Sequence, residues 1–272
     1  MFVLKFLTKK EIEEIFDKDS KLVIDYLLKK VLFSQPELLP GEKNGNIQMT
    51  KEFLEDWVAQ ALNWKIIGAG NYPIDVYSKK DKVGADVKFL SSKVDDNGDF
   101  INGTSNETSL SQKFKSAGKN LDQLFKRKKK KEILEGWTKI LIEKNEIPIK
   151  DYNLKYIYYF IFIRGESSIN LAVAKVNKEL IPNIKISKFT DTSVFISGYV
   201  DDKYGNVKIY KSKKRIELRC IPKKLEKDNL LIKWNFDENL KYQKPIRLRD
   251  IVGNKNKFKK YISQKIKEFF DF

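Results

Sequence analysis

Two aspartates and a lysine between residues 71 and 93 have a spacing that suits metal-dependent hydrolysis. Asp75 lies in an alternating apolar and polar stretch, Tyr72 to Ser78, and Asp86 and Lys88 lie in a second one, Val83 to Ser91. Because side chains of a strand repeat every two residues, Asp86 and Lys88 share one face. Carboxylates supply the oxygen ligands of Mg²⁺, and a nearby lysine can position water or stabilise charge on a phosphate. The pattern predicts phosphate chemistry, although a hairpin with ordinary surface charges would share it.

This hairpin resembles the signature of the PD-(D/E)xK nucleases, in which an Asp on one strand and an acid-x-Lys group on the next bind Mg²⁺. Asp86-Val-Lys88 fits the second half, whereas one residue separates Pro73 from Asp75. The resemblance implies that Asp75, Asp86 and the Val87 carbonyl ligate Mg²⁺, and that Lys88 orients the attacking water. Replacing Asp75, Asp86 or Lys88 is then expected to abolish cleavage and to leave the protein folded.

A helix before the hairpin adds a further candidate. Thr50 is a favourable N-cap for a helix over Lys51 to Trp64, and Glu55 lies at the edge of its apolar stripe. Nucleases that resemble this chain often use a Glu of such a helix near the metal. Glu55 is therefore the candidate third acidic residue, although a solvated helix charge would look the same.

Composition limits both the chemistry and the partners. The chain has 272 residues, 41% of them hydrophobic, and no histidine, which excludes His-based catalysis, His metal ligands and a catalytic triad. Its one cysteine excludes a disulfide framework and a Cys-rich zinc site. Lys and Arg number 54 against 37 Asp and Glu, a net charge of +17. This excess indicates a polyanionic partner, unless a lysine-rich proteome biases every surface.

The remaining pattern predicts an α/β (α+β) fold with a central mixed β-sheet flanked by helices, and the resemblance implies that its core is like that of the PD-(D/E)xK restriction endonucleases. Helices are expected over Lys9–Val31, with a possible break at Asp17–Ser20, over Leu110–Leu141 and over Lys257–Phe270. Strands are expected over Leu154–Arg164, Asn170–Val176, Ile184–Tyr199, Val207–Ile221 and Leu230–Phe236. Val94–Ser109 is expected to be a polar loop. Residues 1–180 would hold the helical N-terminus and the catalytic core, and residues 181–272 a basic, β-rich part packed on the same domain.

A closer resemblance is to the small type II restriction endonucleases that cut four-base, GC-rich sites such as GCGC and CCGG. The stretches that support it are Lys88-Phe-Leu-Ser-Ser-Lys93 and the later Gly205-Asn-Val-Lys-Ile-Tyr-Lys-Ser-Lys-Lys214. This chain differs from some of these enzymes at Asp86, because they have Gln or Asn at the corresponding position. The resemblance implies a cytoplasmic, Mg²⁺-dependent enzyme that cuts a short double-stranded DNA sequence as a monomer or homodimer. It also implies a DNA methyltransferase encoded nearby. No apolar run approaches the ~20 residues of a membrane span.

Basic residues of the later strands are the candidates for reading DNA, because Arg and Lys to guanine are the commonest specific contacts. The expected DNA contacts are Lys93, Gln112, Lys211, Lys213, Lys214, Arg215 and Arg219. The unbroken run Lys126–Lys131 suits diffuse attraction to phosphates. Two alternatives stay open: a structure-specific or nonspecific nuclease with the same chemistry, and a non-catalytic nucleic-acid-binding protein. The chain has no ATP-binding Gly-x-x-x-x-Gly-Lys-Ser/Thr loop, which argues against a self-contained motor nuclease.

Overall fold

The fold was analysed in a computed structural model of the chain, which describes residues 1–42, 47–67, 72–93, 120–165, 168–211, 215–235 and 245–270. The helices are α1 (Lys9–Ile15), α2 (Lys18–Phe33), α3 (Lys51–Leu62), α5 (Leu121–Lys126), α6 (Lys130–Tyr152), η1 (Lys178–Asn183), α7 (Pro222–Lys227), α9 (Arg249–Val252) and α10 (Lys255–Phe270). The strands are β1 (Leu4–Phe6), β2 (Lys65–Ile66), β3 (Val76–Ser78), β4 (Val83–Ser91), β5 (Tyr156–Arg164), β6 (Ser168–Val176), β7 (Lys185–Phe189), β8 (Ser193–Ser197), β9 (Gly205–Tyr210), β10 (Arg215–Cys220) and β11 (Ile232–Asn235).

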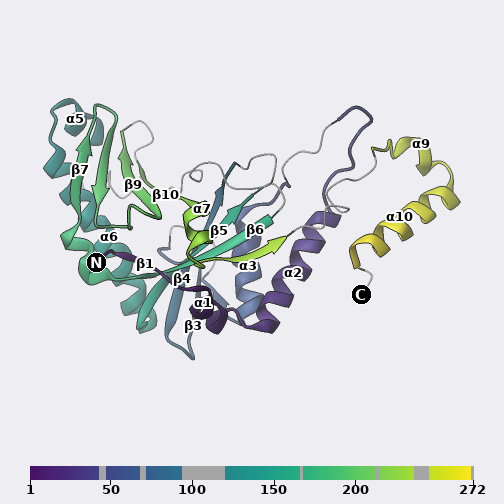
Figure 1. The fold of residues 1–272 in the computed structure, drawn as a ribbon, viewed down its shortest axis with the longest axis horizontal. Coiled ribbons are helices and arrows are strands. Elements are labelled where there is room, and N and C mark those ends of the chain that lie inside the picture. The colour runs from purple at the N-terminus through teal and green to yellow at the C-terminus, as the bar shows by residue number, and fades with distance from the viewer. Residues whose placement is uncertain are drawn as a thin grey trace.

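A mixed sheet forms the centre of the molecule (Figure 1). Within the described residues it has seven strands, in the order β1-β6-β5-β4-β3-β2, with β11 also paired to β6. The hairpin strands β3 and β4 are antiparallel, whereas β4 and β5 are parallel and are joined through α6. The parallel pairing places β4 between two strands, so its backbone is fixed on both sides.

The two faces of this sheet bury different elements. On the first, which we call the α3 face, Val76, Ala85, Val87 and Phe160 pack with residues of α1, α2 and α3. On the second, the α6 face, Leu90, Ile161 and Ile163 pack with the apolar stripe of α6, including the fully buried Trp137. Alternation along β4 therefore directs Ala85 and Val87 to the α3 face and Asp86 and Lys88 to the α6 face.

Four antiparallel strands, β7 to β10, form a second sheet that lies at one end of the molecule beside α5, opposite α9 and α10 (Figure 1). Its apolar residues, among them Val194, Ile209 and Ile216, belong to the same core as the α6 face. The chain then returns to the first sheet through β11. Residues after 180 thus contribute to both sheets.

The expected mixed sheet flanked by helices is confirmed, and two details of the helices were wrong. The helix expected to end at Leu141 continues to Tyr152 as α6. The run Lys126–Lys131 does not lie on one helix, because α5 ends at Lys126, Lys128 has a φ of 55°, and α6 begins at Lys130. The expected loop Val94–Ser109 lies outside the described residues. The break between the first two helices is confirmed, since Asp17 caps α2 by accepting a hydrogen bond from the Ser20 N–H.

No helix in the described part of the chain is long and apolar enough to cross a membrane.

Cys220 ends β10 in the core and should be chemically inert. Burial raises the pKa of its thiol to about 12, and the thiolate is the reactive form. We expect a thiol reagent such as DTNB at pH 8 to leave the native protein unlabelled and to label the denatured protein completely. Labelling at the same rate in both states would contradict the burial of this residue.

Candidate active site

Asp75 lies immediately before β3 and is bonded to β4 on both sides of Asp86. Its backbone N–H donates to the Ala85 carbonyl at 2.9 Å, and its carboxylate accepts a 2.6 Å hydrogen bond from the Val87 N–H. Since residues 85 and 87 flank Asp86 in sequence, these two bonds bring the aspartates together across neighbouring strands. The predicted convergence of the two halves of the hairpin is thus present in the backbone pairing.

Asp86 forms ion pairs with two lysines. Its Oδ1 lies 2.5 Å from the Nζ of Lys88, two residues along β4, and its Oδ2 lies 2.5 Å from the Nζ of Lys144 on α6. The three residues are only 3%, 5% and 5% exposed, in the order Asp86, Lys88, Lys144. A buried charge is costly unless it is paired. Each of these three residues therefore depends on its ion-pair partner to remain charged inside the protein. Asp86 and Lys88 were expected to share one face, and their ion pair agrees with that; Lys144 is an addition that sequence reasoning missed.

Two tyrosines line the same cluster. The ammonium groups of Lys88 and Lys144 lie 5.7 Å and 5.2 Å from the ring centre of Tyr159 on β5, within the range of cation–π attraction. The hydroxyl of Tyr159 lies 3.3 Å from that of Tyr199, which follows β8. Burial, and next the neighbouring Tyr159, raise the pKa of Tyr199 well above its ordinary value. Tyr199 therefore stays protonated and contributes a neutral hydroxyl to the cluster.

The position of Lys144 in α6 explains why it reaches the sheet. Trp137, Ile140 and Leu141 form the buried stripe of this helix, and Lys144 follows them at helical spacing on the same face. Pro148, one turn later, has no N–H to donate to the Lys144 carbonyl, which removes a helical hydrogen bond there. A lysine on an apolar stripe was the signal available in the sequence. It was missed because the expected helix ended at Leu141.

Glu55, the expected third acidic residue, lies on a helix that packs on the other face of the sheet. Its neighbours on α3, Leu54, Trp57 and Val58, pack on the α3 face with Ala85 and Val87. Glu55 itself is half-buried. Asp86 and Lys88 project from the α6 face, so α3 does not bring Glu55 to them as directly as α6 brings Lys144.

The expected DNA contacts are partly described. Lys93 is exposed just after β4, and Lys211 is half-buried just after β9. Arg219, on β10, donates a 3.2 Å hydrogen bond to the Tyr210 hydroxyl and lies 3.6 Å from the buried Glu217. Gln112, Lys213 and Lys214 lie outside the described residues, as does the side chain of Arg215.

The oxygen atoms of the hairpin fit a magnesium ion better than a transition metal. In the described part of the chain no group of three His, Cys, Asp or Glu residues could hold a metal by itself. Mg²⁺ does not need one, because it keeps several waters and binds through one or two carboxylates together with substrate phosphates. Asp75 and Asp86 supply two carboxylates, and the Val87 carbonyl points to the same strand edge as the N–H bonded to Asp75.

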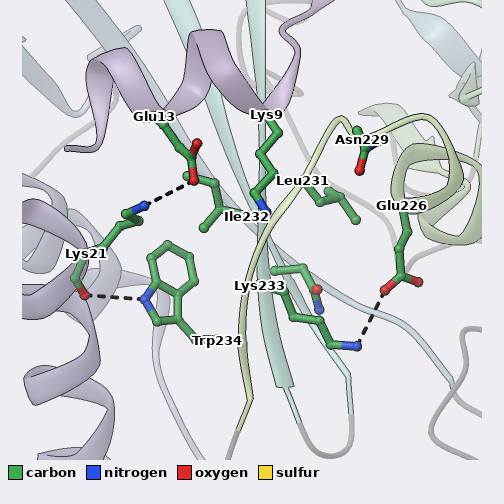
Figure 2. A pocket seen from close by; sticks show the side chains of 10 residues that line it. Lys9, Glu13, Lys21, Glu226, Asn229, Leu231, Ile232, Lys233 and Trp234 are labelled. Atoms are coloured by element: carbon green, nitrogen blue, oxygen red, sulfur yellow. Dashed lines mark hydrogen bonds and ion pairs between the residues drawn. The ribbon is translucent and has the colours of Figure 1, made fainter. Parts of the chain in front are cut away.

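A cavity of about 330 Å³ between α1, α2, α7 and β11 is a separate site (Figure 2). The carboxylates that line it are paired with lysines, Glu13 with Lys21 at 3.1 Å and Glu226 with Lys233 at 3.4 Å. None of the residues predicted to act on phosphate lines this cavity. It suits a small polar molecule and lacks the paired aspartates of the hairpin.

Comparison with protein-family models, with curated proteins and with solved structures found no match to the chain. A functional proposal therefore depends on the hairpin and on the residues packed around it.

Proposed function

We propose that this chain is a Mg²⁺-dependent endonuclease that hydrolyses phosphodiester bonds of a specific short double-stranded DNA sequence, as type II restriction endonucleases do. The observation that supports it most is the bonding of Asp75 to both neighbours of Asp86, with Lys88 ion-paired to Asp86. Two carboxylates, a main-chain carbonyl and a lysine are thus held on or beside one short segment of β4, residues 85–88. The resemblance to the PD-(D/E)xK signature and the net charge of +17 support the same proposal.

The architecture is compatible with a PD-(D/E)xK core. A helix, α3, precedes the hairpin and packs under it, as the resemblance implies. The strand with Asp86 and Lys88 lies inside the sheet between β3 and β5, so both side chains project from a rigid backbone. Rigid strands hold catalytic groups more accurately than loops do, which suits a reaction that depends on positioning.

In the proposed reaction, Asp75, Asp86 and the Val87 carbonyl hold Mg²⁺, which when bound supplies Lewis-acid stabilisation of charge on the scissile phosphate. Lys88 orients the attacking water through its ammonium group. With no histidine in the chain, Asp, Glu, Lys and Tyr are the side chains available for proton transfer. The pairing of Lys88 with Asp86 keeps that ammonium beside the carboxylate proposed to bind Mg²⁺.

Burial places a condition on this proposal and favours one alternative. Asp86 and Lys88 keep 3% and 5% of their exposure, so a phosphodiester reaches them only after a covering segment moves. A non-catalytic nucleic-acid-binding protein would need no such movement, because its buried ion pairs would only join α6 to the sheet. The two functions differ in whether DNA is cut.

The test is incubation of the purified protein with plasmid DNA and Mg²⁺. Discrete bands are expected, and EDTA should abolish them. A smear would indicate a structure-specific or nonspecific nuclease, and retention of uncut DNA would indicate a binding protein. Cutting that resists EDTA would contradict the metal mechanism. A DNA methyltransferase gene beside this one would support the restriction proposal, because such an enzyme would protect the host DNA.

General attraction to DNA phosphates and recognition of specific bases should depend on different basic residues of this chain. The exposed run Lys126–Lys131 spans the junction of α5 and α6, so its charges spread in several directions and suit phosphates. Arg219 is instead held on a strand by Tyr210, which fixes its direction. We expect neutralising the run to weaken binding to all DNA and to flatten its salt dependence. Arg219→Ala should reduce discrimination between cognate and random DNA by about 1–3 kcal/mol.

Both sets of variants should be measured on cognate and random duplexes across a salt series. Lys223→Ala, on the exposed surface of α7, is a matched control for the loss of one charge. If both sets of variants lose affinity for cognate and random DNA in the same ratio, the separate roles proposed for the lysine run and for Arg219 are wrong.

A further inference from the structure

We propose that Lys144 is a positioning residue of the same site, and that it holds the Asp86 carboxylate in the orientation that binds Mg²⁺. This inference rests on the proposed function. Lys144 reaches Asp86 from α6, 58 residues further along the chain, and its Nζ lies 2.5 Å from Oδ2. Lys88 holds the other oxygen at the same distance. A carboxylate bound through both oxygens can neither rotate nor move along the strand, and each oxygen can accept a further bond.

Packing alone does not explain a lysine at this position. Trp137, Ile140 and Leu141 already anchor α6 with at most 3% exposure each. Apolar residues in place of both partners of a buried ion pair often stabilise a protein as well or better, so packing alone would be served equally by an apolar residue at 144 together with an uncharged residue at 86. The ammonium group of Lys144 is explained if the Asp86 carboxylate must be held in a fixed orientation to bind Mg²⁺.

Charge balance points to the same role. Asp75 and Asp86 carry two negative charges, and Lys88 and Lys144 carry two positive ones, while Tyr159 and Tyr199 add no charge when protonated. The four charged groups therefore cancel before any ligand arrives. A divalent cation would then be balanced by the scissile phosphate and an attacking hydroxide. Without Lys144 the remaining three groups would carry one net negative charge.

The test compares Lys144→Met, which keeps the length of the stem, with Lys144→Arg, which keeps the charge. Lys139→Met and Lys150→Met, exposed on the same helix, are matched controls. Mg²⁺ binding to the folded protein without DNA should be measured by calorimetry, together with single-turnover cleavage. We expect Lys144→Met to weaken Mg²⁺ binding by about 10–100-fold, as loss of an orienting partner does, and Lys144→Arg to recover most of it. The controls should match the unaltered protein.

The possible results separate this inference from the proposed function. Unchanged Mg²⁺ affinity in a folded Lys144→Met protein, with normal cleavage by the unaltered chain, would overturn the role of Lys144 alone. Tighter Mg²⁺ binding would also overturn it, because Lys144 would then compete with the cation. An unaltered chain that neither binds Mg²⁺ nor cuts DNA would overturn both. Circular dichroism and a urea titration of every variant would show that only folded proteins are compared.

Discussion

Replacing Asp86 by alanine should lower the free energy of unfolding by about 3–5 kcal/mol, the cost of breaking a buried ion pair. Asp86 is the common partner of Lys88 and Lys144, and both lysines keep only 5% of their exposure. Its loss leaves two ammonium groups buried without the carboxylate that balances them. The sequence alone predicted that Asp86→Ala would remain folded, and the buried pairs change that expectation.

Urea denaturation of Asp86→Ala measures this directly, with Lys79→Ala in the exposed turn of the same hairpin as the control. The triple variant Asp86→Leu, Lys88→Met, Lys144→Met should regain much of the lost stability, because apolar residues of similar volume often replace a buried pair without cost. An Asp86→Ala protein that unfolds at the same urea concentration as the unaltered chain would show that the pairs contribute nothing. A loss of cleavage in Asp86→Ala has meaning only beside this measurement.

Local patterns predicted most of the elements because they depend on neighbours in the sequence. The alternation at Val83–Ser91 gave β4 with its correct faces, and Thr50 caps α3 by accepting a hydrogen bond from the Phe53 N–H. The same alternation brought Asp86 and Lys88 to one face. Asp75 lies just before β3 and not within a strand, but it still bonds to β4 because a short turn leaves the two strands of the hairpin few ways to pair.

Contacts between distant segments could not be predicted in the same way. Lys144 meets Asp86 only because α6 crosses from β4 to β5 and lays its stripe on the sheet, which depends on the parallel pairing of those strands. The cluster is lined further by Tyr199, which follows β8 of the second sheet and whose hydroxyl lies 3.3 Å from that of Tyr159. A single sequence shows which residues can ionise, but whether those residues are buried depends on tertiary packing.

Asp75→Asn should reduce cleavage by about 1,000-fold or more and leave the fold nearly unchanged. Asp75 is half-buried, and its main local bond is accepted from the Val87 N–H at 2.6 Å. The asparagine oxygen can accept the same bond, so the variant removes the charge and keeps that hydrogen bond. A metal contributes several kcal/mol to the stabilisation of the transition state, and each 1.4 kcal/mol is a factor of ten in rate. The free energy of unfolding should change by about 1 kcal/mol or less.

Asp81→Asn, in the turn of the same hairpin, is the matched control, because it makes the same change at an exposed position that accepts a hydrogen bond from Ser78. Single-turnover cleavage and DNA binding should be measured for both. Retained DNA binding with lost cleavage in Asp75→Asn alone would assign Asp75 to the chemistry. Cleavage at the normal rate would remove Asp75 from the site. Because this variant keeps the Asp86 ion pairs intact, it separates the metal proposal from the stability of the buried cluster.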